Sequence, residues 1–149
     1  MKQPTVLFLC TGNYYRSRFA EEYFNHHAPT RGSRWRAISR ALATELGGRN
    51  VGPISPHALR GLNNRGISLA TPLRFPRSLQ TFELETAESI VALCEREHRP
   101  MIVERFLDWE HRVEYWSMDD VDVDTPDNVL PKLSRELDDF IGRLVTCHP

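Results

Sequence analysis

Short apolar runs alternate with longer amphipathic segments along this chain, and the two patterns predict strands and helices in turn. A short apolar run between polar residues is typical of a strand, whereas apolar residues at every third or fourth position indicate a helix. The predicted strands are Thr5–Leu9, Trp35–Ser39, Ser89–Leu93 and Val113–Trp116. The predicted helices are Ser17–His26, Ser55–Asn64, Glu95–Phe106 and Asn128–Val145.

Several residues mark the ends of the predicted helices. Ser17 is expected to cap the first helix through its hydroxyl group. Ser55 and Pro56 indicate the start of the second helix, and Gly66 indicates its end. Pro100 lies inside the third predicted helix, so we expect it to kink or split that helix.

Strands that alternate with crossover helices form a parallel sheet. We therefore expect a single α/β domain over residues 1–149, built on an open four-stranded parallel sheet of order 2-1-3-4 with helices on both faces. Flavodoxin-like sheets of this kind bind ligands beyond the carboxyl ends of their strands. The first and fourth predicted strands should therefore end near the functional site.

Composition excludes several classes of protein. The formal net charge of −1 argues against nucleic acid or an anionic membrane as a partner. The three cysteines, Cys10, Cys94 and Cys147, are odd in number and far apart, so they imply no disulfide framework. Neither a membrane span nor a signal peptide is evident, so we expect a cytoplasmic protein. The histidines form no paired metal-ligand set, so we interpret them as surface or helix-cap residues and expect no metal and no cofactor.

The most informative chemistry lies at Cys10, where the first predicted strand ends. The loop that separates it from Arg16 and Ser17 has the sequence Thr11-Gly12-Asn13-Tyr14-Tyr15. Such a loop wraps its backbone N–H groups around a tetrahedral anion, and the next helix points its positive end at the same place. Arg16 adds a planar fork that matches two oxygens of the anion, and Ser17 is placed to donate to the sulfur. A thiol beside a cation at a helix N-terminus ionises readily, so the pattern predicts a thiolate directed at phosphorus.

The alternative for Cys10 is a small buried side chain at a strand end, without a chemical role. That interpretation gives no reason for Gly12 and Asn13, which suit a tight turn, or for Arg16 and Ser17. The spacing of cysteine and arginine alone occurs by chance in a chain with many arginines. The strand before the loop and the helix after it are what favour an anion site.

The stretch Val6–Ser17 reads Val-Leu-Phe-Leu-Cys-Thr-Gly-Asn-Tyr-Tyr-Arg-Ser, which resembles the signature of the low-molecular-weight protein tyrosine phosphatases. Thioredoxin-coupled arsenate reductases share that fold. The resemblance implies the phosphotyrosine phosphatase I fold and hydrolysis of phosphotyrosine, in a protein or in a small phosphomonoester, through a phosphocysteine at Cys10. It implies that Arg16 and the backbone of residues 11–16 bind the oxyanion, a place that free phosphate or sulfate can occupy. The implied substrate-binding residues are Thr11, Gly12, Asn13, Tyr14, Tyr15 and Ser17.

The resemblance also implies a general acid that protonates the leaving phenolate and later activates water. In the family this acid is an aspartate before a proline, several residues beyond the last strand. The matching position is Asp120, with Val121 in the place of the proline, and Asp119 is the alternative. Alternating aspartates are also found in calcium loops, but Thr125 stands where such a loop needs glycine. The other aspartates of this turn are interpreted as solvated cap residues: Asp122, Asp124 and Asp127.

Further residues are implied to support or flank the loop. Asn13 and Ser39 match positions whose side chains brace it, and the usual His-x-x-Arg brace corresponds to Arg74–Arg77, with its histidine replaced. Tyr15 stands where many members carry a second, protective cysteine, so that protection is lost. Tyr14 is expected either to stack on the ring of phosphotyrosine or to pack at the rim of the site.

Other functions stay open at this point. Cys94 matches the first shuttle cysteine of arsenate reductases, but its partner cysteine is missing, so arsenate reduction needs an external thiol. A phosphate carrier is also possible, although Arg16 and Asp120 favour hydrolysis over storage of the phosphoryl group. A catalytically impaired phosphate-binding module is favoured only by Tyr15, Val121 and the altered brace.

Overall fold

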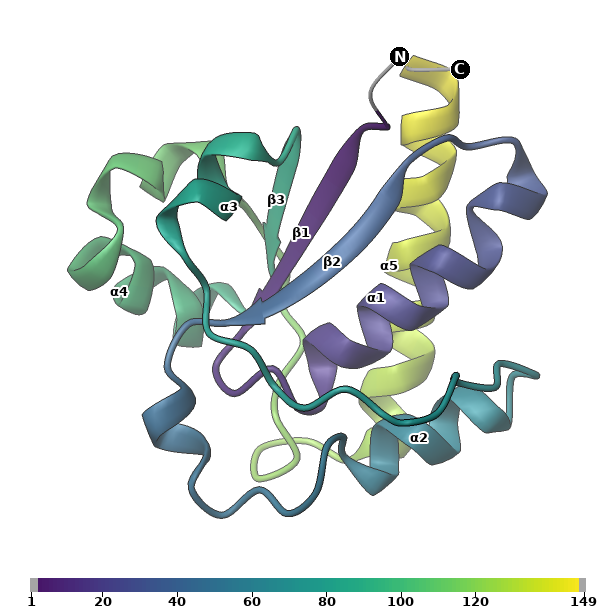
Figure 1. The fold of residues 1–149 in the computed structure, drawn as a ribbon, viewed down its shortest axis with the longest axis horizontal. Coiled ribbons are helices and arrows are strands. Elements are labelled where there is room, and N and C mark those ends of the chain that lie inside the picture. The colour runs from purple at the N-terminus through teal and green to yellow at the C-terminus, as the bar shows by residue number, and fades with distance from the viewer. Residues whose placement is uncertain (1–2, 148–149) are drawn as a thin grey trace.

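Strand β1 (Thr5–Cys10) lies inside a four-stranded parallel sheet in the computed structural model, which describes residues 3–147 (Figure 1). It pairs with β2 (Arg36–Ala41) on one side and with β3 (Ser89–Ala92) on the other, and β3 pairs with β4 (Glu114–Tyr115). All three pairings are parallel, so the predicted order 2-1-3-4 is confirmed. Cys10 ends β1 and therefore stands at the carboxyl edge of the sheet, where ligands bind in such folds.

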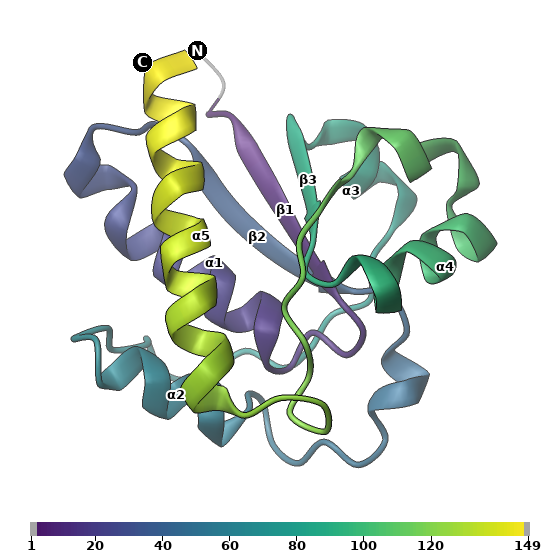
Figure 2. The ribbon, with the colours of Figure 1, turned by 180° about the vertical axis from the view of Figure 1, so that it is seen from behind.

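Helices cover both faces of the sheet, as predicted (Figures 1 and 2). One face carries α1 (Arg16–His27), α2 (Pro56–Asn63) and α5 (Pro126–Cys147), and the other carries α3 (Thr81–Thr86) and α4 (Glu95–Arg105). Within the part of the chain that the structure describes, no helix is long and apolar enough to cross a membrane.

Strand β1 sends alternate side chains into two hydrophobic cores. Val6, Phe8 and Cys10 belong to the core beneath α1 and α5, whereas Leu7 and Leu9 belong to the core beneath α3 and α4. All five of these side chains are buried. The alternation fixes the side of the sheet on which the Cys10 sulfur lies, which is the side where α1 begins.

Several element boundaries differ by a few residues from the prediction, and at two of them tertiary contacts give the reason. Ser17 does not cap α1: the helix begins at Arg16 without a side-chain cap, and the Ser17 hydroxyl contacts Cys10 and Asn13 instead. Strand β2 continues past Ser39 to Ala41, whose backbone exchanges hydrogen bonds of 2.8 and 2.9 Å with residues 77 and 79.

Local sequence signals correctly predict the start of α2, but they do not predict α3 or the continuity of α4. Ser55 accepts a hydrogen bond of 3.1 Å from the backbone N–H of His57, and Pro56 occupies the first turn, as predicted. Helix α4 runs through Pro100 without a split. Helix α3 was not predicted, because it has only six residues and no apolar period over that length.

Candidate active site

The loop between β1 and α1 begins at Cys10 and ends at Arg16. The Cys10 Sγ atom lies 2.9 Å from the hydroxyl oxygen of Ser17. That oxygen also accepts a hydrogen bond of 2.9 Å from Nδ2 of Asn13. Since the amide supplies this donor, the hydroxyl proton of Ser17 is free to point at the sulfur. A donated hydrogen bond of this kind stabilises a thiolate more than a thiol.

Asn13 holds the loop in a conformation that most residues avoid. Its φ of +51° lies in the left-handed region, which asparagine adopts more readily than other residues with a Cβ. Its side chain is fully buried. The amide Oδ1 accepts from Arg74 Nη1 at 3.0 Å and from the backbone N–H of Arg77 at 3.1 Å, while Nδ2 donates to Ser17 and Ser39 at 2.9 Å each. These four partners fix both the orientation of the amide and the turn of the loop.

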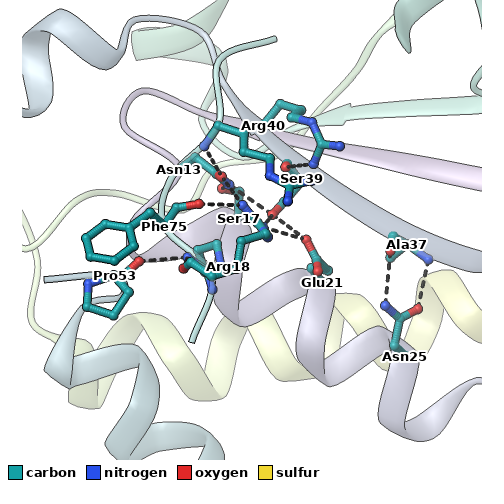
Figure 3. A network of polar contacts seen from close by, with 12 residues as sticks. Asn13, Ser17, Arg18, Glu21, Asn25, Ala37, Ser39, Arg40, Pro53 and Phe75 are labelled. Atoms are coloured by element: carbon teal, nitrogen blue, oxygen red, sulfur yellow. Dashed lines mark hydrogen bonds and ion pairs between the residues drawn. The ribbon is translucent and has the colours of Figure 1, made fainter. Parts of the chain in front are cut away.

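Arg74 occupies the position where the sequence implied an altered brace. Its Nη2 donates to the hydroxyl of Ser39 and to Oε1 of Glu21, at 3.1 Å in both cases. The Ser39 hydroxyl in turn donates to Glu21 at 2.6 Å. Figure 3 shows Asn13, Ser17, Ser39 and Glu21 converging on one point beside the loop. An arginine with an acidic partner therefore braces the loop in this chain.

Arg18 anchors α1 to two segments that lie beside the loop, a role that the sequence did not suggest. It is buried, and its Nη1 donates to the backbone oxygen of Pro53 at 2.8 Å (Figure 3). The same Nη1 donates to the backbone oxygen of Arg74 at 2.8 Å. Burial lowers the pKa of Arg18, and the neighbouring charge of Arg74 acts in the same direction. Arginines on helices usually reach solvent, so no sequence signal pointed to this anchor.

Arg16 is a buried cation that closes the loop. Its Nη1 and Nη2 donate to the two carboxylate oxygens of Glu97 at 3.1 and 2.7 Å, and Nη1 also donates to the backbone oxygen of Met118 at 3.0 Å. Burial alone would lower the pKa of Arg16, but Glu97 and the other negative groups around it outweigh burial and raise it. The surroundings of Arg16 therefore favour its charged form.

The two candidate acids face different partners. Asp120 Oδ2 lies 3.5 Å from Nη2 of Arg16, and its side chain is 41% exposed. Asp119 instead accepts a hydrogen bond of 2.6 Å from Arg96, and the Cys94 sulfur lies 3.6 Å from the same carboxylate oxygen. The arrangement directs Asp120 toward the loop and Asp119 toward α4.

A cavity of about 40 Å³ opens at the loop. It is lined by Cys10, Gly12, Tyr14, Tyr15, Arg16, Asn50 and Asp120. The three predicted catalytic residues therefore meet in one place, whereas Thr11, Asn13 and Ser17 turn their side chains to protein neighbours instead. A larger cavity of about 240 Å³ between α2 and α5 contains none of the predicted site residues.

Asn50 is a cavity residue that sequence reasoning missed. It comes from the exposed segment after β2, and its Nδ2 lies so close to Gly12 that a Cβ at Gly12 would stand only 3.0 Å away. Gly12 therefore permits a close approach of backbone and amide. Nothing in the local sequence around Asn50 indicates this contact.

The two tyrosines of the loop differ in their surroundings. The Tyr14 hydroxyl donates to the backbone oxygen of Val51 at 2.6 Å, which ties the cavity wall to the segment after β2. Tyr15 is buried against the edge of His57, and its hydroxyl has no hydrogen-bond partner among the described residues. Burial, reinforced by the charge of Asp120, raises the pKa of Tyr15 to about 12. Tyr15 is therefore a neutral, apolar part of the wall.

Cys94 and His98 form the start of α4 behind the loop. Cys94 is buried two residues beyond the end of β3, and burial raises the pKa of its thiol. His98 is a cap residue, because its Nδ1 accepts from the backbone N–H of Cys94 at 3.0 Å. It is not a surface residue, since it is completely buried. The sequence did not indicate that burial.

The parallel sheet, the cysteine–arginine loop at its carboxyl edge and the aspartate across the cavity define an α/β protein with a thiol, a guanidinium and a carboxyl group at one cavity. The sequence profile of the family described as "Low molecular weight phosphotyrosine protein phosphatase" matches residues 5–136. The chain belongs to this family, as its loop sequence implied. A search of curated proteins found no match.

Solved structures agree with this assignment. A low molecular weight protein tyrosine phosphatase from T. tengcongensis is 25% identical, with a TM-score of 0.74 over 96% of this chain and 98% of that chain. YfkJ from Bacillus subtilis is 18% identical, with a TM-score of 0.82 over 100% and 99%. The YwlE arginine phosphatase from Geobacillus stearothermophilus is 23% identical, with a TM-score of 0.68 over 95% and 90%. The latter two show the shared fold alone, whereas the family assignment supports a cysteine-based phosphatase.

Proposed function

We propose that this chain hydrolyses phosphotyrosine, in proteins or in small phosphomonoesters, through a phosphocysteine at Cys10. The observation that carries the proposal is the convergence of a thiol, a guanidinium and a carboxyl group on one cavity, with Ser17 at 2.9 Å from the sulfur and Asp120 at 3.5 Å from Arg16. Each of these groups has a distinct task in transferring a phosphoryl group to a thiolate and then to water.

In the first step the Cys10 thiolate attacks phosphorus. The sulfur–phosphorus bond forms while the bond from phosphorus to the phenolic oxygen breaks, and the proton of Asp120 goes to that oxygen. Arg16 and the backbone N–H groups of residues 11–16 balance the charge on the equatorial oxygens. The exposure of Asp120 supports this role, because the leaving group must reach the acid from the mouth of the cavity.

In the second step a water molecule replaces the leaving group. Asp120, now a carboxylate, takes a proton from the water as its oxygen bonds to phosphorus and the sulfur–phosphorus bond breaks. The Cys10 thiolate leaves, stabilised by the Ser17 hydroxyl and by the charge of Arg16. Free phosphate then departs and the site returns to its starting state.

The competing functions receive less support. Arsenate reduction within the chain needs a second thiol, but Cys94, the other cysteine whose side chain is described, contacts Asp119 and is buried. A phosphate carrier has no use for an acid at the position of Asp120. The altered brace favours a binding module without catalysis only if the loop lacks support. Arg74 supplies that support through hydrogen bonds to both Asn13 and Ser39, which weakens the argument for a binding module.

The proposal is tested by varying the leaving group with wild type, Asp120→Asn and Asp119→Asn. A phenol of low pKa leaves without a proton, whereas the phenol of tyrosine does not. The deficit of Asp120→Asn in kcat/KM should therefore widen as the pKa of the leaving phenol rises, and should reach about 10²–10⁴-fold on phosphotyrosine. Asp119→Asn is the matched control, and its effect should be small and equal for all substrates.

Two results would contradict the proposal. A flat deficit for Asp120→Asn across the series would remove its role as the acid, and the opposite ranking of the variants would give that role to Asp119. A phosphoarginine peptide belongs in the same assay, because the YwlE structure that resembles this chain is an arginine phosphatase. Turnover of that peptide above the phosphotyrosine peptide would overturn the proposed substrate.

A further inference from the structure

A polar cluster from the first turn of α4 lies behind the loop, and the proposed mechanism makes no use of it. Its centre is Glu97, whose carboxylate accepts one hydrogen bond from Nη1 and one from Nη2 of Arg16, on what we call the outer edge of the guanidinium. The same carboxylate accepts from the hydroxyl of Thr11 and lies 3.1 Å from Nε2 of His98. Glu97 therefore connects the first residue after Cys10 to the last residue of the loop.

The contacts of Arg16 divide its guanidinium into two edges. A guanidinium has five N–H bonds in a fixed plane. Nη1 uses its two for Glu97 and the backbone oxygen of Met118, and Nη2 uses one for Glu97. The Nε–H and the second Nη2–H form no hydrogen bond within the described residues, although Oδ2 of Asp120 lies 3.5 Å from Nη2. These two N–H groups lie side by side on the other edge. This is the edge that can hold two oxygens of a phosphate at once.

The Glu97 carboxylate is itself held in place. His98 accepts the backbone N–H of Cys94 on Nδ1, so its own proton lies on Nε2, which faces Glu97 and lies 3.2 Å from the Thr11 hydroxyl. Burial would raise the pKa of Glu97, but hydrogen bonds from His98, Arg16 and Thr11 outweigh burial and hold it well below its ordinary value. The surroundings of Glu97 therefore favour its anionic form.

We propose that Glu97 is a positioning residue: it grips the outer edge of the Arg16 guanidinium so that the other edge faces the phosphate. The inference rests on the proposed phosphoryl transfer, and it assigns a residue that the loop sequence does not contain. Without the carboxylate, Arg16 keeps its charge but loses the contact that sets the plane of its fork. Binding of phosphate and stabilisation of the transition state should then weaken together.

The test is a double-variant cycle on Glu97 and Arg16, read as kcat/KM on p-nitrophenyl phosphate. Glu97→Gln keeps the size of the side chain but removes its charge, and we expect a loss of about 10- to 100-fold, typical of a misaligned catalytic group. Arg16→Lys already lacks the fork, so adding Glu97→Gln to it should cost less than about threefold. Glu97→Asp keeps the charge on a shorter side chain and should recover part of the activity.

Glu95→Gln is the matched control, because Glu95 lies in the same turn of α4 but pairs with Arg99 at 2.6 Å, away from the loop. Its kcat/KM should equal that of wild type. If Glu97→Gln costs the same factor in the Arg16→Lys background as in wild type, Glu97 does not act through Arg16 and the inference is overturned.

A second readout separates this inference from the proposed function. The dissociation constant of inorganic phosphate, measured by calorimetry, should rise about tenfold or more in Glu97→Gln and stay unchanged in Glu95→Gln. If wild type binds phosphate with this pattern but turns over no phosphomonoester, the proposed function fails while Glu97 keeps its role. If phosphate binding is equal in wild type and Glu97→Gln, or absent in wild type, the positioning role fails.

Discussion

Replacement of Asn13 tests how the loop is held in shape. Two variants separate the two properties of this residue: Asn13→Ala removes the amide and leaves a Cβ at a φ of +51°, whereas Asn13→Gly removes the amide and relieves the backbone. Both variants abolish the four hydrogen bonds of the buried Asn13 side chain, two donated and two accepted.

The magnitude follows from these contacts. Each buried hydrogen bond contributes about 1 kcal/mol, and some partners keep other contacts, so both variants should lose about 3–4 kcal/mol of unfolding free energy. Asn13→Ala loses about 1–2 kcal/mol more, because an alanine is strained in the left-handed region. Asn13→Gly avoids this strain but loses about 0.5–1 kcal/mol, because glycine has greater freedom in the unfolded chain. Asn13→Gly should therefore be more stable than Asn13→Ala by roughly 0.5–1 kcal/mol.

Urea unfolding followed by tryptophan fluorescence gives both values, because a small α/β domain unfolds in one transition. In parallel, kcat/KM on p-nitrophenyl phosphate should fall in both variants, since the backbone donors of the loop lose their alignment. A loss below about 1 kcal/mol in either variant, or an alanine variant more stable than the glycine variant, would show that Asn13 does not hold the loop as described.

Three further predictions concern buried groups. Burial lowers the pKa of His98 although its hydrogen bond to Glu97 opposes this, so its contribution to stability is complete above pH ~6.5 and declines as pH falls below it. The difference in unfolding free energy between wild type and His98→Asn should thus shrink as the pH falls from 6.5 to 5, by at most about 1.4 kcal/mol per pH unit. If urea titrations give the same difference at each pH, the imidazole is not neutral in the folded protein. Tyr15→Phe should raise the unfolding free energy by about 1 kcal/mol, because the Tyr15 hydroxyl is buried without a hydrogen-bond partner among the described residues. A lower unfolding free energy in this variant would show that the hydroxyl has such a partner. Iodoacetate should modify Cys10 before Cys94, because Cys10 lines the cavity at the loop whereas the pKa of the Cys94 thiol is raised by burial, and phosphate should protect Cys10. Peptide mass spectrometry that finds Cys94 modified first would contradict this order.

The fold could be predicted from the sequence because its signals are local. The apolar run of β1, the amphipathic period of α1 and the alternation of strands and helices each depend on neighbouring residues. Cys10 ends the apolar run, so it stands at the carboxyl edge once the strands are parallel. The sequence does not predict helix α3, because six residues are too few to show an apolar period.

The supporting residues of the site could not be predicted, because they depend on contacts between distant segments. Glu97 and His98 are adjacent polar residues in a helix and resemble a solvated surface, yet they meet Arg16 and Thr11 behind the loop. Arg74 was identified as a departure from the family pattern. Sequence alone does not show that Asn13, Ser39 and Glu21 all lie within reach of its guanidinium.

The central claim is that phosphate passes through a covalent bond to Cys10. The most direct measurement is the intact mass of the protein after rapid acid quenching of Asp120→Asn during turnover of p-nitrophenyl phosphate, whose phenol leaves readily without a proton. Because this variant lacks the carboxylate that activates water, the intermediate should accumulate, and fragmentation should place one added phosphoryl group on Cys10. Cys10→Ala, treated in the same way, should gain no such mass. Turnover by Cys10→Ala, or a phosphoryl group found on any other residue of Asp120→Asn, would contradict the account.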